Sequence, residues 1–350
     1  MDLTEEEAKK TPKKAMVLAA GLGERLRPLT LEQPKPLIPV ANRPLIEFNL
    51  DLLKRHGIEE VAVNLHYMGD RIKEDLGDGS RFGLRIVYSE EPTLLGTGGG
   101  IRKMRDFFGD RAFVVINADI LIDIDLGEVI GFHCSRRAFS TMVLRPNPDP
   151  VRYGTIETDH SGRIREFLGK VKTRQAGLEK WMFTGIHIMD PEVMNFMPKR
   201  KTFCINRDVY AQWIRSNKPC YGYIHRGYWK DLGSITDYFQ ANQDVLVNNA
   251  LKLGSADNRP ANYKTGNGVT VDPASLIGNG AVIKDEAVIG PGAIIGDRCT
   301  IGAGSRVSNS LLWPDTVIGD RENIHGMIVT RYQRIQLQEN NDPILIASSE

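Results

Sequence analysis

Residues 18–30 read Leu18-Ala19-Ala20-Gly21-Leu22-Gly23-Glu24-Arg25-Leu26-Arg27-Pro28-Leu29-Thr30, and Gln33-Pro34-Lys35-Pro36-Leu37 follows shortly afterwards. A short apolar strand therefore leads into a Gly-x-Gly turn, two arginines and a lysine between prolines. Backbone amides approach phosphate oxygens most closely where no Cβ intervenes, and glycine permits the positive φ angles of an anion-binding turn. This order of residues predicts an α/β domain whose first loop binds a polyphosphate.

Arg25 and Lys35 are the candidate catalytic residues, because they would hold fixed positive charge beside the phosphates. Prolines on both sides of Lys35 restrict its backbone and disfavour a helix. We therefore expect this lysine to project from an extended and rigid loop.

Two familiar phosphate-binding motifs do not fit this stretch. A dinucleotide fingerprint requires a third glycine, or an alanine, at the position of Leu26. A Walker loop ends in Gly-Lys-Ser/Thr, and no such ending follows. The stretch thus predicts a phosphate-binding loop of another kind.

The composition argues against a partner that is recruited by charge alone. The chain has 350 residues, with 45 lysines and arginines against 44 aspartates and glutamates, which leaves a formal charge of +1. So balanced a charge gives no field that would attract nucleic acid or an anionic membrane. Residues 1–14 lack the apolar stretch of a secretory signal, and no apolar run is long enough to cross a bilayer. We expect a cytoplasmic protein without a nucleic-acid or membrane partner.

The four cysteines are Cys134, Cys204, Cys220 and Cys299. They are far apart and show no Cys-x-x-Cys spacing, which argues against a zinc site or a redox pair. We expect reduced thiols.

Short β-branched apolar runs alternate with amphipathic stretches from about Ala15 to Gln243. The expected strands are 15–19, 61–65, 85–88, 113–116, 140–144 and 185–189, and residues 45–57 read as a helix that ends at Gly57. The pattern predicts a Rossmann-like α/β fold with a mixed, mostly parallel sheet and helices on both faces.

A different pattern begins after a Gly/Asn-rich stretch near residues 254–268. Aliphatic residues recur every six positions, glycines follow several of them, and small residues stand four positions further on. The members are Ile277, Ile283, Ile289, Ile295, Ile301 and Val307, then Gly278, Gly290, Gly296 and Gly302, then Ala281, Ala287 and Ala293. This period fits neither a helix nor a flat strand but is that of a triangular β-helix. We predict a short left-handed parallel β-helix whose repeat slips near Trp313-Pro314.

The two patterns predict a catalytic domain over residues 1–250, a hexapeptide-repeat domain over residues 251–338 and a tail over residues 339–350. Hexapeptide repeats also occur in acyltransferases, but His325 lies after the regular part and has no evident partner in the sequence. We favour a structural role for the repeats, either in the contact of a homo-oligomer or in bracing the catalytic domain.

Two carboxylates follow apolar runs and are the candidate metal ligands. Asp119 stands at the end of the strand 113–116, where ligands bind in open α/β sheets, and Asp231 follows the run 221–225. Two hard oxygen donors, together with substrate phosphates, suit Mg²⁺. The alternative is that Asp119 caps a helix and that Asp231 serves a cap or a turn.

The chain resembles the sugar-nucleotide pyrophosphorylases, which join a sugar 1-phosphate to a nucleoside triphosphate. The resemblance rests on the stretch 18–37 and on two further motifs, Asn117-Ala118-Asp119 and Trp229-Lys230-Asp231-Leu232-Gly233. It implies that Ala20, Gly21 and Gly23 bind the nucleotide, that Arg25 and Lys35 are catalytic, and that Asp119 and Asp231 hold Mg²⁺.

The run Gly96-Thr97-Gly98-Gly99-Gly100-Ile101-Arg102 leads into an amphipathic stretch. A base or ribose could lie against so bare a backbone, and the N-terminus of a helix favours anions. The run resembles a Leu-Gly-Thr-Ala-Gly segment of the family that borders the nucleotide, which makes Gly96, Thr97 and Gly98 candidate nucleotide ligands. The alternative is a flexible hairpin tip.

The segments Tyr153-Gly154-Thr155-Ile156 and Phe167-Leu168-Gly169-Lys170 resemble motifs on the sugar side of the family. Gly154, Lys170 and Thr184 are therefore the candidate sugar-phosphate ligands, although Lys170 could be an ordinary surface lysine. Many family members have Glu-Lys-Pro where this chain has Gly169-Lys170-Val171, and Asn-Ala-Gly where it has Phe183-Thr184-Gly185. These departures leave the sugar undetermined.

Within the family, the chain most resembles the mannose-1-phosphate guanylyltransferases, on Gly96-Thr97, the Trp-Lys-Asp motif and the short appended β-helix. The resemblance implies a Mg²⁺-dependent enzyme that makes GDP-mannose from GTP and mannose 1-phosphate. A glucose- or heptose-1-phosphate nucleotidyltransferase that uses another NTP stays an alternative, as does a non-catalytic subunit that binds sugar nucleotides.

Overall fold

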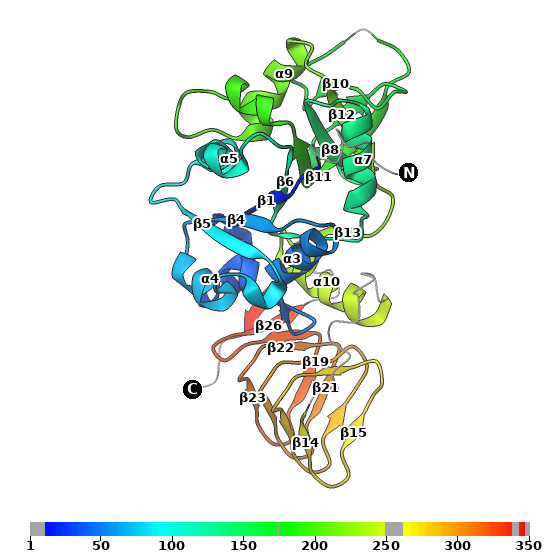
Figure 1. Cartoon of the computed structure of the whole chain (residues 1–350). Coiled ribbons are helices and arrows are strands. Elements are labelled where there is room, and N and C mark those ends of the chain that lie inside the picture. Colours follow the sequence, from blue (N-terminus) through cyan, green and yellow to red (C-terminus); the bar gives the residue numbers. More distant parts are fainter. Residues whose placement is uncertain (1–10, 174, 249–261, 338–342, 347–350) are drawn as a thin grey trace. The chain divides into compact units, whose positions relative to one another are not determined.

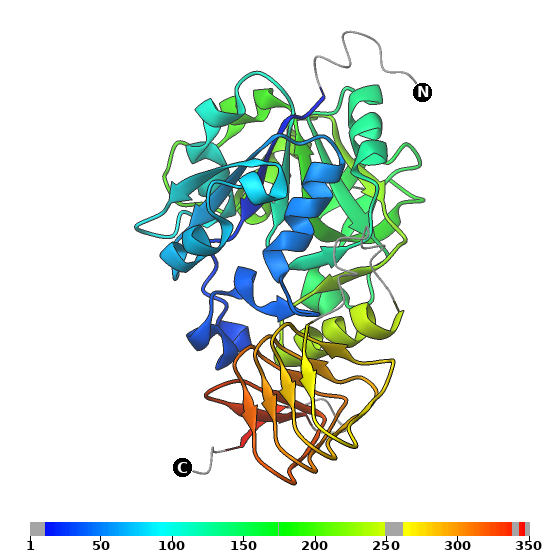
Figure 2. The same ribbon diagram turned by 60° about the horizontal axis from the view of Figure 1, so that its bottom comes forward.

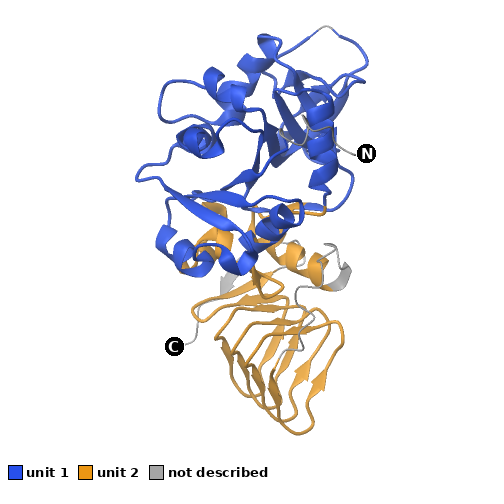
Figure 3. Cartoon of the chain, viewed as in Figure 1, with its two compact units in different colours: residues 1–22, 46–120, 124–229 blue, residues 23–45, 121–123, 230–350 orange. Residues whose placement is uncertain are grey.

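The computed structural model describes residues 11–173, 175–248, 262–337 and 343–346, which form two compact units (Figure 3). Unit 1 comprises residues 1–22, 46–120 and 124–229, and unit 2 comprises residues 23–45, 121–123 and 230–350. The units are interleaved along the sequence, whereas the domains predicted from the sequence are consecutive. The segment 23–45, which carries Arg25 and Lys35, therefore belongs to the same unit as the C-terminal elements.

A nine-stranded sheet forms the centre of unit 1 (Figure 1). Its main path runs β10-β9-β11-β6-β1-β4-β5, while β8 pairs with both β11 and β12. The strands are β1 (Lys14–Leu18), β4 (Glu60–Leu65), β5 (Arg85–Glu90), β6 (Phe113–Asn117), β8 (Ser140–Arg145), β9 (Ile156–Thr158), β10 (Ile164–Phe167), β11 (Glu179–Met189) and β12 (Cys220–Ile224). The pairs of β1 with β4 and β6, of β4 with β5 and of β8 with β12 are parallel. The other pairs are antiparallel, so the predicted mixed sheet is confirmed.

All six strands expected from the sequence are present, but β11 begins six residues earlier than the expected strand at Gly185. Its pairing with β8 shifts register between Phe183 and His187, where Gly185 has a φ of 103°. An irregularity of this kind interrupts the alternation of side chains. The apolar pattern therefore indicated only the regular second part of the strand.

The helices of this part of the chain are α3 (Leu45–Arg55), α4 (Gly69–Leu76), α5 (Gly96–Lys103), α6 (Arg105–Phe108), α7 (Leu126–Ser135), α8 (Pro150–Tyr153) and α9 (Ala211–Arg215). Shorter turns are η3 (Ser80–Phe82), η4 (Pro191–Phe196) and the π-helix η5 (Asn206–Tyr210). The expected glycine stop is confirmed at Gly57, which has a φ of 79° and donates to the Lys54 carbonyl. In Figure 1, α5 lies on one side of β1, β4 and β5, and α3 and α4 lie on the other.

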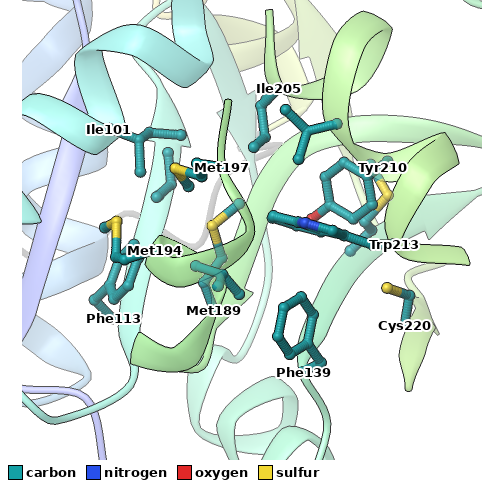
Figure 4. Packing of buried hydrophobic residues seen from close by; sticks show 14 of the residues in the cluster. Ile101, Phe113, Phe139, Met189, Met194, Met197, Ile205, Tyr210, Trp213 and Cys220 are labelled. Atoms are coloured by element: carbon teal, nitrogen blue, oxygen red, sulfur yellow. The ribbon is translucent and has the colours of Figure 1, made fainter. Parts of the chain in front are cut away.

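The core of unit 1 is rich in aromatic and methionine side chains (Figure 4). Met16, Ala62 and Val115 of the central strands belong to the same buried cluster as Ile101 of α5. Their neighbours in the strands, such as Val17, are fully buried as well. A central strand that is buried on both faces requires cover on both sides, which the helices supply.

Unit 2 begins with short elements that contain the signature residues. These are η1 (Glu24–Leu26), α2 (Leu29–Glu32), η2 (Lys35–Leu37), β2 (Pro39–Val40) and β3 (Arg43–Pro44), and β2 pairs with β3. The longer helix α10 (Ile235–Asn248) precedes the C-terminal part of the unit. Two further strands, β7 (Ile120–Ile122) and β13 (Trp229–Asp231), form a two-stranded sheet.

The C-terminal part of unit 2 is a β-helix of short parallel strands on three faces, and Figure 2 shows its coils lying side by side. One face consists of β14 (Lys264–Thr265), β17 (Val282–Ile283), β20 (Thr300–Ile301) and β23 (Val317–Ile318). The second consists of β15 (Thr270–Val271), β18 (Val288–Ile289), β21 (Arg306–Ser308) and β24 (Asn323–His325), and the third of β16 (Leu276–Ile277), β19 (Ile294–Ile295), β22 (Leu311–Leu312) and β25 (Met327–Val329). The predicted β-helix is thus confirmed, whereas its left hand stays a prediction.

The hexad residues form the interior of the β-helix, as the period predicts. Ile283, Ile289, Ile295 and Ile301 are fully buried, and so are the small residues two positions before them, such as Ala287. The slip lies earlier than expected. Residue partners are 18 apart up to Val288 and Arg306, but Ile294 pairs with Leu311, 17 residues on. The lost residue therefore lies between β21 and β22, where Asn309 has a φ of 44°, and not at Trp313-Pro314.

The boundary predicted at residues 250–251 lies outside the described residues. Within the predicted tail, Pro343–Ile346 form β27, which pairs with β26 (Arg334–Leu337). All four cysteines are free thiols. Across the parts of the chain that the structure describes, no helix combines the length and the apolar composition needed to cross a membrane.

Candidate functional site

The predicted site residues are divided between the two units. Unit 1 carries Ala20, Gly21, Gly96, Thr97, Gly98, Asp119, Gly154, Lys170 and Thr184, and unit 2 carries Gly23, Arg25, Lys35 and Asp231. Each group is described within its own unit. That the two groups meet around one substrate stays a prediction.

Gly23 closes the turn of the signature segment. Its φ of 66° is left-handed, as an anion-binding turn requires, and its carbonyl accepts hydrogen bonds from Leu26 N at 2.9 Å and Thr30 Oγ1 at 2.9 Å. A Cβ at this position would lie 2.9 Å from Thr30 Cγ2 and 3.2 Å from Lys35 Cβ. Glycine is therefore required both by the backbone and by the close approach of Lys35.

The two cations of this segment differ in surroundings, since Arg25 is exposed and Lys35 is half-buried. The expectation that Lys35 lies in an extended loop is wrong. Pro34 is extended, but Lys35–Leu37 form a single 3₁₀ turn, with Leu37 N donating to the Pro34 carbonyl at 2.8 Å. Proline is tolerated in the first turn of a helix, because its missing N–H has no partner to lose there.

A buried polar network follows β1 in unit 1, and sequence reasoning missed it. Asn64, at the end of β4, accepts from Ala19 N at 2.8 Å and donates to Glu91 Oε1 at 2.8 Å. The other oxygen of Glu91 accepts from Leu95 N at 2.9 Å. Asn64 and Glu91 are 4% and 2% exposed, so their contacts fix the backbone before Ala20 against the backbone before Gly96. The only signal in the sequence was a pair of polar residues at strand ends.

The glycine run itself forms the first turns of α5 instead of preceding a helix. A Cβ on Gly98 would lie 2.4 Å from the Phe203 ring, and one on Gly99 would lie 2.4 Å from the Lys201 carbonyl oxygen. The amides of both glycines donate to the Phe203 carbonyl, at 3.0 and 3.2 Å. Packing against the segment 201–205 thus requires these glycines, and the hairpin-tip alternative is wrong.

Thr97 is part of the same contact, because its Oγ1 accepts a hydrogen bond from Ile205 N at 3.0 Å. Gly96 is exposed and has a φ of 70°. Gly96 is thus the most exposed member of the predicted nucleotide-binding trio, Thr97 is half-buried, and Gly98 is buried. The contact of the trio with a nucleotide stays a prediction.

Asp119 lies between β6 and β7, at the carboxyl end of β6, as expected. It does not cap a helix, since Asp125 caps α7 by accepting from Gly127 N at 2.8 Å. Asp231 is the last residue of β13. It does not cap α10, because Ser234 Oγ accepts from Asp237 N at 3.1 Å. The alternative cap roles of both aspartates are therefore excluded.

Asp119 belongs to unit 1 and Asp231 to unit 2, so their joint use as metal ligands stays a prediction. Two carboxylates suit Mg²⁺, which prefers oxygen ligands and leaves several positions to water and substrate phosphates. Among the described residues, no group of three or more His, Cys, Asp and Glu is placed to hold a metal ion without such additional ligands.

Trp229 contacts several of the residues that the sequence predicts to lie near the sugar phosphate. Its indole Nε1 donates to the Thr184 carbonyl at 2.7 Å, its carbonyl accepts from Arg145 Nη1 at 3.0 Å, and its ring meets that of Tyr153 edge to face. Burial lowers the pKa of the Arg145 guanidinium, and the Arg145 Nε atom is buried without a hydrogen-bond partner. The residues Tyr153-Gly154 and Thr184 are thus brought together, with Arg145 as a member that the sequence did not reveal.

Gly154 and Lys170 lie on adjoining turns. Gly154 has a φ of 69°, a Cβ there would lie 2.6 Å from Leu168 Cδ2, and Leu168 N donates to the Thr155 carbonyl at 2.8 Å. Lys170 is exposed, and its ammonium group donates to the Arg207 carbonyl. The Thr184 hydroxyl is buried and donates to the Val143 carbonyl at 2.8 Å. The sugar-phosphate roles of these residues stay predictions.

Comparison with protein families matches both parts of the chain. The family described as nucleotidyl transferase matches residues 14–248, and the one described as the GMPPB C-terminal domain matches residues 271–341.

The curated relatives differ in substrate. A UTP–glucose-1-phosphate uridylyltransferase of Synechocystis is 36% identical over 67% of this chain and 63% of its own length. A mannose-1-phosphate guanylyltransferase of Mycobacterium tuberculosis is 33% identical over 66% of this chain and 64% of its own length. A mannose-1-phosphate guanylyltransferase catalytic subunit beta of Dictyostelium discoideum is 30% identical over 75% of this chain and 72% of its own length. The chain thus spans less than two thirds of the first two relatives.

Among solved structures, a Bacillus anthracis protein named as a glucose-1-phosphate thymidylyltransferase, in complex with sucrose, is similar with a TM-score of 0.57. The match covers 65% of this chain and 93% of that one at 24% identity. A likeness at this identity supports the fold alone, and it agrees with the mixed α/β sheet.

Proposed function

Because the chain belongs to the nucleotidyl transferase family, we propose that it joins a nucleoside triphosphate to a sugar 1-phosphate, with GTP and mannose 1-phosphate as the preferred pair. The observation that carries the choice of pair is the match of residues 271–341 to the GMPPB C-terminal domain. Relatives named mannose-1-phosphate guanylyltransferase at 33% and 30% identity support it further.

In the proposed reaction, a phosphate oxygen of the sugar 1-phosphate attacks the α-phosphorus of the NTP. The new P–O bond forms as the bond to the β-phosphate bridge breaks, and pyrophosphate leaves with the electron pair. Both reactants are anions, so the barrier is largely electrostatic. Arg25 and Lys35 neutralise the triphosphate and the leaving pyrophosphate, and the exposure of Arg25 supports this role. Lys170 holds the phosphate of the sugar.

Asp119 and Asp231 would hold Mg²⁺, and the place of Asp119 at the carboxyl end of β6, where ligands bind in open α/β sheets, supports its part in this role. When bound, the ion supplies positive charge and polarises the phosphate oxygens.

A second substrate pair, UTP and glucose 1-phosphate, is favoured by one specific observation. The relative with 36% identity carries that name. The match covers 67% of this chain. Relatives that cover similar shares of the chain are thus named for either pair.

The deciding experiment offers the purified chain five NTPs against mannose, glucose and heptose 1-phosphates with Mg²⁺, and measures released pyrophosphate. We expect the highest kcat/KM for GTP with mannose 1-phosphate. A highest value for UTP with glucose 1-phosphate would establish the second pair instead. Absence of pyrophosphate release from every pair, with nucleotide sugars still bound, would identify a non-catalytic subunit.

The metal role is tested by Asp119→Asn, which keeps the shape of the side chain and removes its charge. We expect the Mg²⁺ concentration at half-maximal activity to rise at least about tenfold, or activity to disappear. Asp123→Asn, between β7 and α7, is the matched control and should leave the Mg²⁺ dependence as in the wild type. An unchanged Mg²⁺ dependence in Asp119→Asn would contradict the assignment.

A further inference from the structure

The segment that carries Arg25 and Lys35 shares unit 2 with α10 and the β-helix, and Figure 3 shows the three in one colour. Most of the segment consists of single turns and two-residue strands. Elements this short have few hydrogen bonds of their own, so their position depends on what they pack against.

Tyr238 of α10 makes the central contact. Its hydroxyl donates to the Pro39 carbonyl at 2.6 Å and accepts from Trp313 Nε1 of the β-helix at 2.9 Å. Tyr238 is fully buried, and Trp313 is 5% exposed. One hydroxyl group thus connects the β-helix with the backbone four residues after Lys35.

Asn242, one turn further along α10, also hydrogen-bonds to the backbone of the signature segment. Its Oδ1 accepts from Ala41 N at 2.9 Å, and its Nδ2 donates to the Tyr238 carbonyl at 2.9 Å. Asn42 Nδ2 in turn donates to the Ile295 carbonyl of the β-helix at 2.8 Å. Ala41 and Asn42 both have positive φ angles, 45° and 62°, so these contacts hold a tight turn between β2 and β3.

A separate contact lies before Lys35. Thr330, after the last parallel strand of the β-helix, donates to Glu32 Oε1 at 2.6 Å. Burial raises the pKa of Glu32, and the bond from Thr330 opposes this shift. Lys35 is therefore flanked on both sides by residues that hydrogen-bond to the C-terminal part of the chain.

We propose that Tyr238 is a positioning residue, which together with Trp313 fixes the backbone around Lys35 so that the β-helix sets where this cation meets the triphosphate. The inference rests on the proposed function for the role of Lys35. Its physical basis is that the buried Tyr238 hydroxyl retains its partners, because leaving a buried polar group unpaired is costly. Small displacements of a charged group at the reacting phosphates lower the rate steeply.

The first test is Tyr238→Phe, which keeps the ring and removes the hydroxyl. With the substrate pair that the wild type turns over fastest, we expect kcat/KM for the NTP to fall about tenfold, while KM for the sugar 1-phosphate changes less than about twofold. Trp313→Phe leaves the bond to Pro39 in place, and we expect a smaller loss of about threefold. Tyr332→Phe, an exposed tyrosine of the same unit, is the matched control and should behave as the wild type.

The second measurement does not depend on activity. Hydrogen exchange of the backbone amides in residues 33–41 should be faster in Tyr238→Phe than in Tyr332→Phe, whereas exchange in β6 should be equal in both. A wild type that turns over no substrate pair would refute the proposed function and leave this comparison to decide whether the segment is held by Tyr238.

The inference is overturned if Tyr238→Phe loses thermal stability but keeps the wild-type kcat and the wild-type KM for the NTP. If Tyr238→Phe does not fold, the same measurements on Trp313→Phe test the inference. Unchanged NTP kinetics together with unchanged exchange in residues 33–41 of Trp313→Phe would then overturn it.

Discussion

The glycine run of α5 and the signature segment 23–45 both contain glycines next to predicted nucleotide ligands, but they use them differently. In α5, the glycines are required because Phe203 and Lys201 occupy the space where Cβ atoms would lie. In the signature segment, Gly23 allows Thr30 and Lys35 to approach, and the nearby Arg25 extends into solvent.

This difference separates two kinds of motif residue. Some are explained by packing within the protein, and others have a role only when a ligand is bound. Buried glycines with short Cβ distances are sufficiently explained by the fold of unit 1. An exposed arginine has no such explanation, because surface cations add little stability on their own. Substitutions in α5 should therefore change folding, and substitutions of the cations should change catalysis.

The largest effect should come from Lys35→Ala, which separates the two sides of the comparison most clearly. We expect kcat/KM to fall about 100- to 1,000-fold, because a charge that stabilises the transition state is lost. The free energy of unfolding should change by less than about 0.5 kcal/mol, since alanine keeps the Cβ that lies against Gly23. Steady-state pyrophosphate release measures kcat/KM, and urea denaturation measures the free energy of unfolding.

Arg25→Ala should behave in the same way, and Arg27→Ala is its matched control. Arg27 is also exposed and interacts with Glu24 at 3.4 Å. A near-wild-type rate of pyrophosphate release in Lys35→Ala would contradict the catalytic role of this lysine.

The packing side is tested by Gly98→Ala in α5. The added Cβ would lie 2.4 Å from two ring carbons of Phe203, and we expect a loss of about 3 kcal/mol in the free energy of unfolding. Gly131→Ala in α7 is the matched control, because nothing lies within 4 Å of its Cβ position. There we expect a gain of about 0.5–1 kcal/mol, since alanine is the better helix former. Equal free energies of unfolding for the two variants in urea denaturation would show that packing against Phe203 does not require a glycine at position 98.

Two buried histidines of unit 1 make its stability depend on pH. Burial lowers the pKa of His133 to about 4 and that of His187 to about 3, from 6.5. The unfolded chain therefore takes up protons first as the pH falls below 6.5, and folded stability decreases towards pH 4. Between pH 7 and pH 5 we expect a loss of about 2 kcal/mol for each histidine.

His133→Asn, which does not titrate and can still bond Thr141, should remove about half of this loss. His160→Asn, at an exposed site, should leave it unchanged. Urea denaturation at pH 5 and pH 7 measures both. An acid-induced loss in His133→Asn as large as that of the wild type would show that the interior around His133 admits water.

The fold was predictable to a large extent because its signals are local. Short β-branched apolar runs predicted the strands, Gly57 ended a helix, and the six-residue period predicted the β-helix. The predictions of local structure were wrong where a tertiary or backbone contact outweighed the local preference of the residues. Prolines beside Lys35 did not prevent a 3₁₀ turn, and the glycine run became helical because Phe203 accepts hydrogen bonds from its amides.

The candidate site was predictable only as a set of residue types. Motifs predict Arg25, Lys35, Asp119 and Asp231 as site residues, since the proposed reaction requires charge beside the phosphates. Asn64, Glu91 and Tyr238 carry no such signal. Their importance lies in partners 45, 27 and 199 residues away.

Local apolar patterns and the six-residue period thus suffice to predict an α/β part and a β-helix, because these features depend on residues close together in the chain. Motifs add a set of candidate ionisable groups. The assignment of segment 23–45 to the unit of the β-helix became apparent only from the folded chain. It depends on buried hydrogen bonds such as Trp313–Tyr238–Pro39, and the partners of a buried polar group are set by three-dimensional packing, not by sequence spacing.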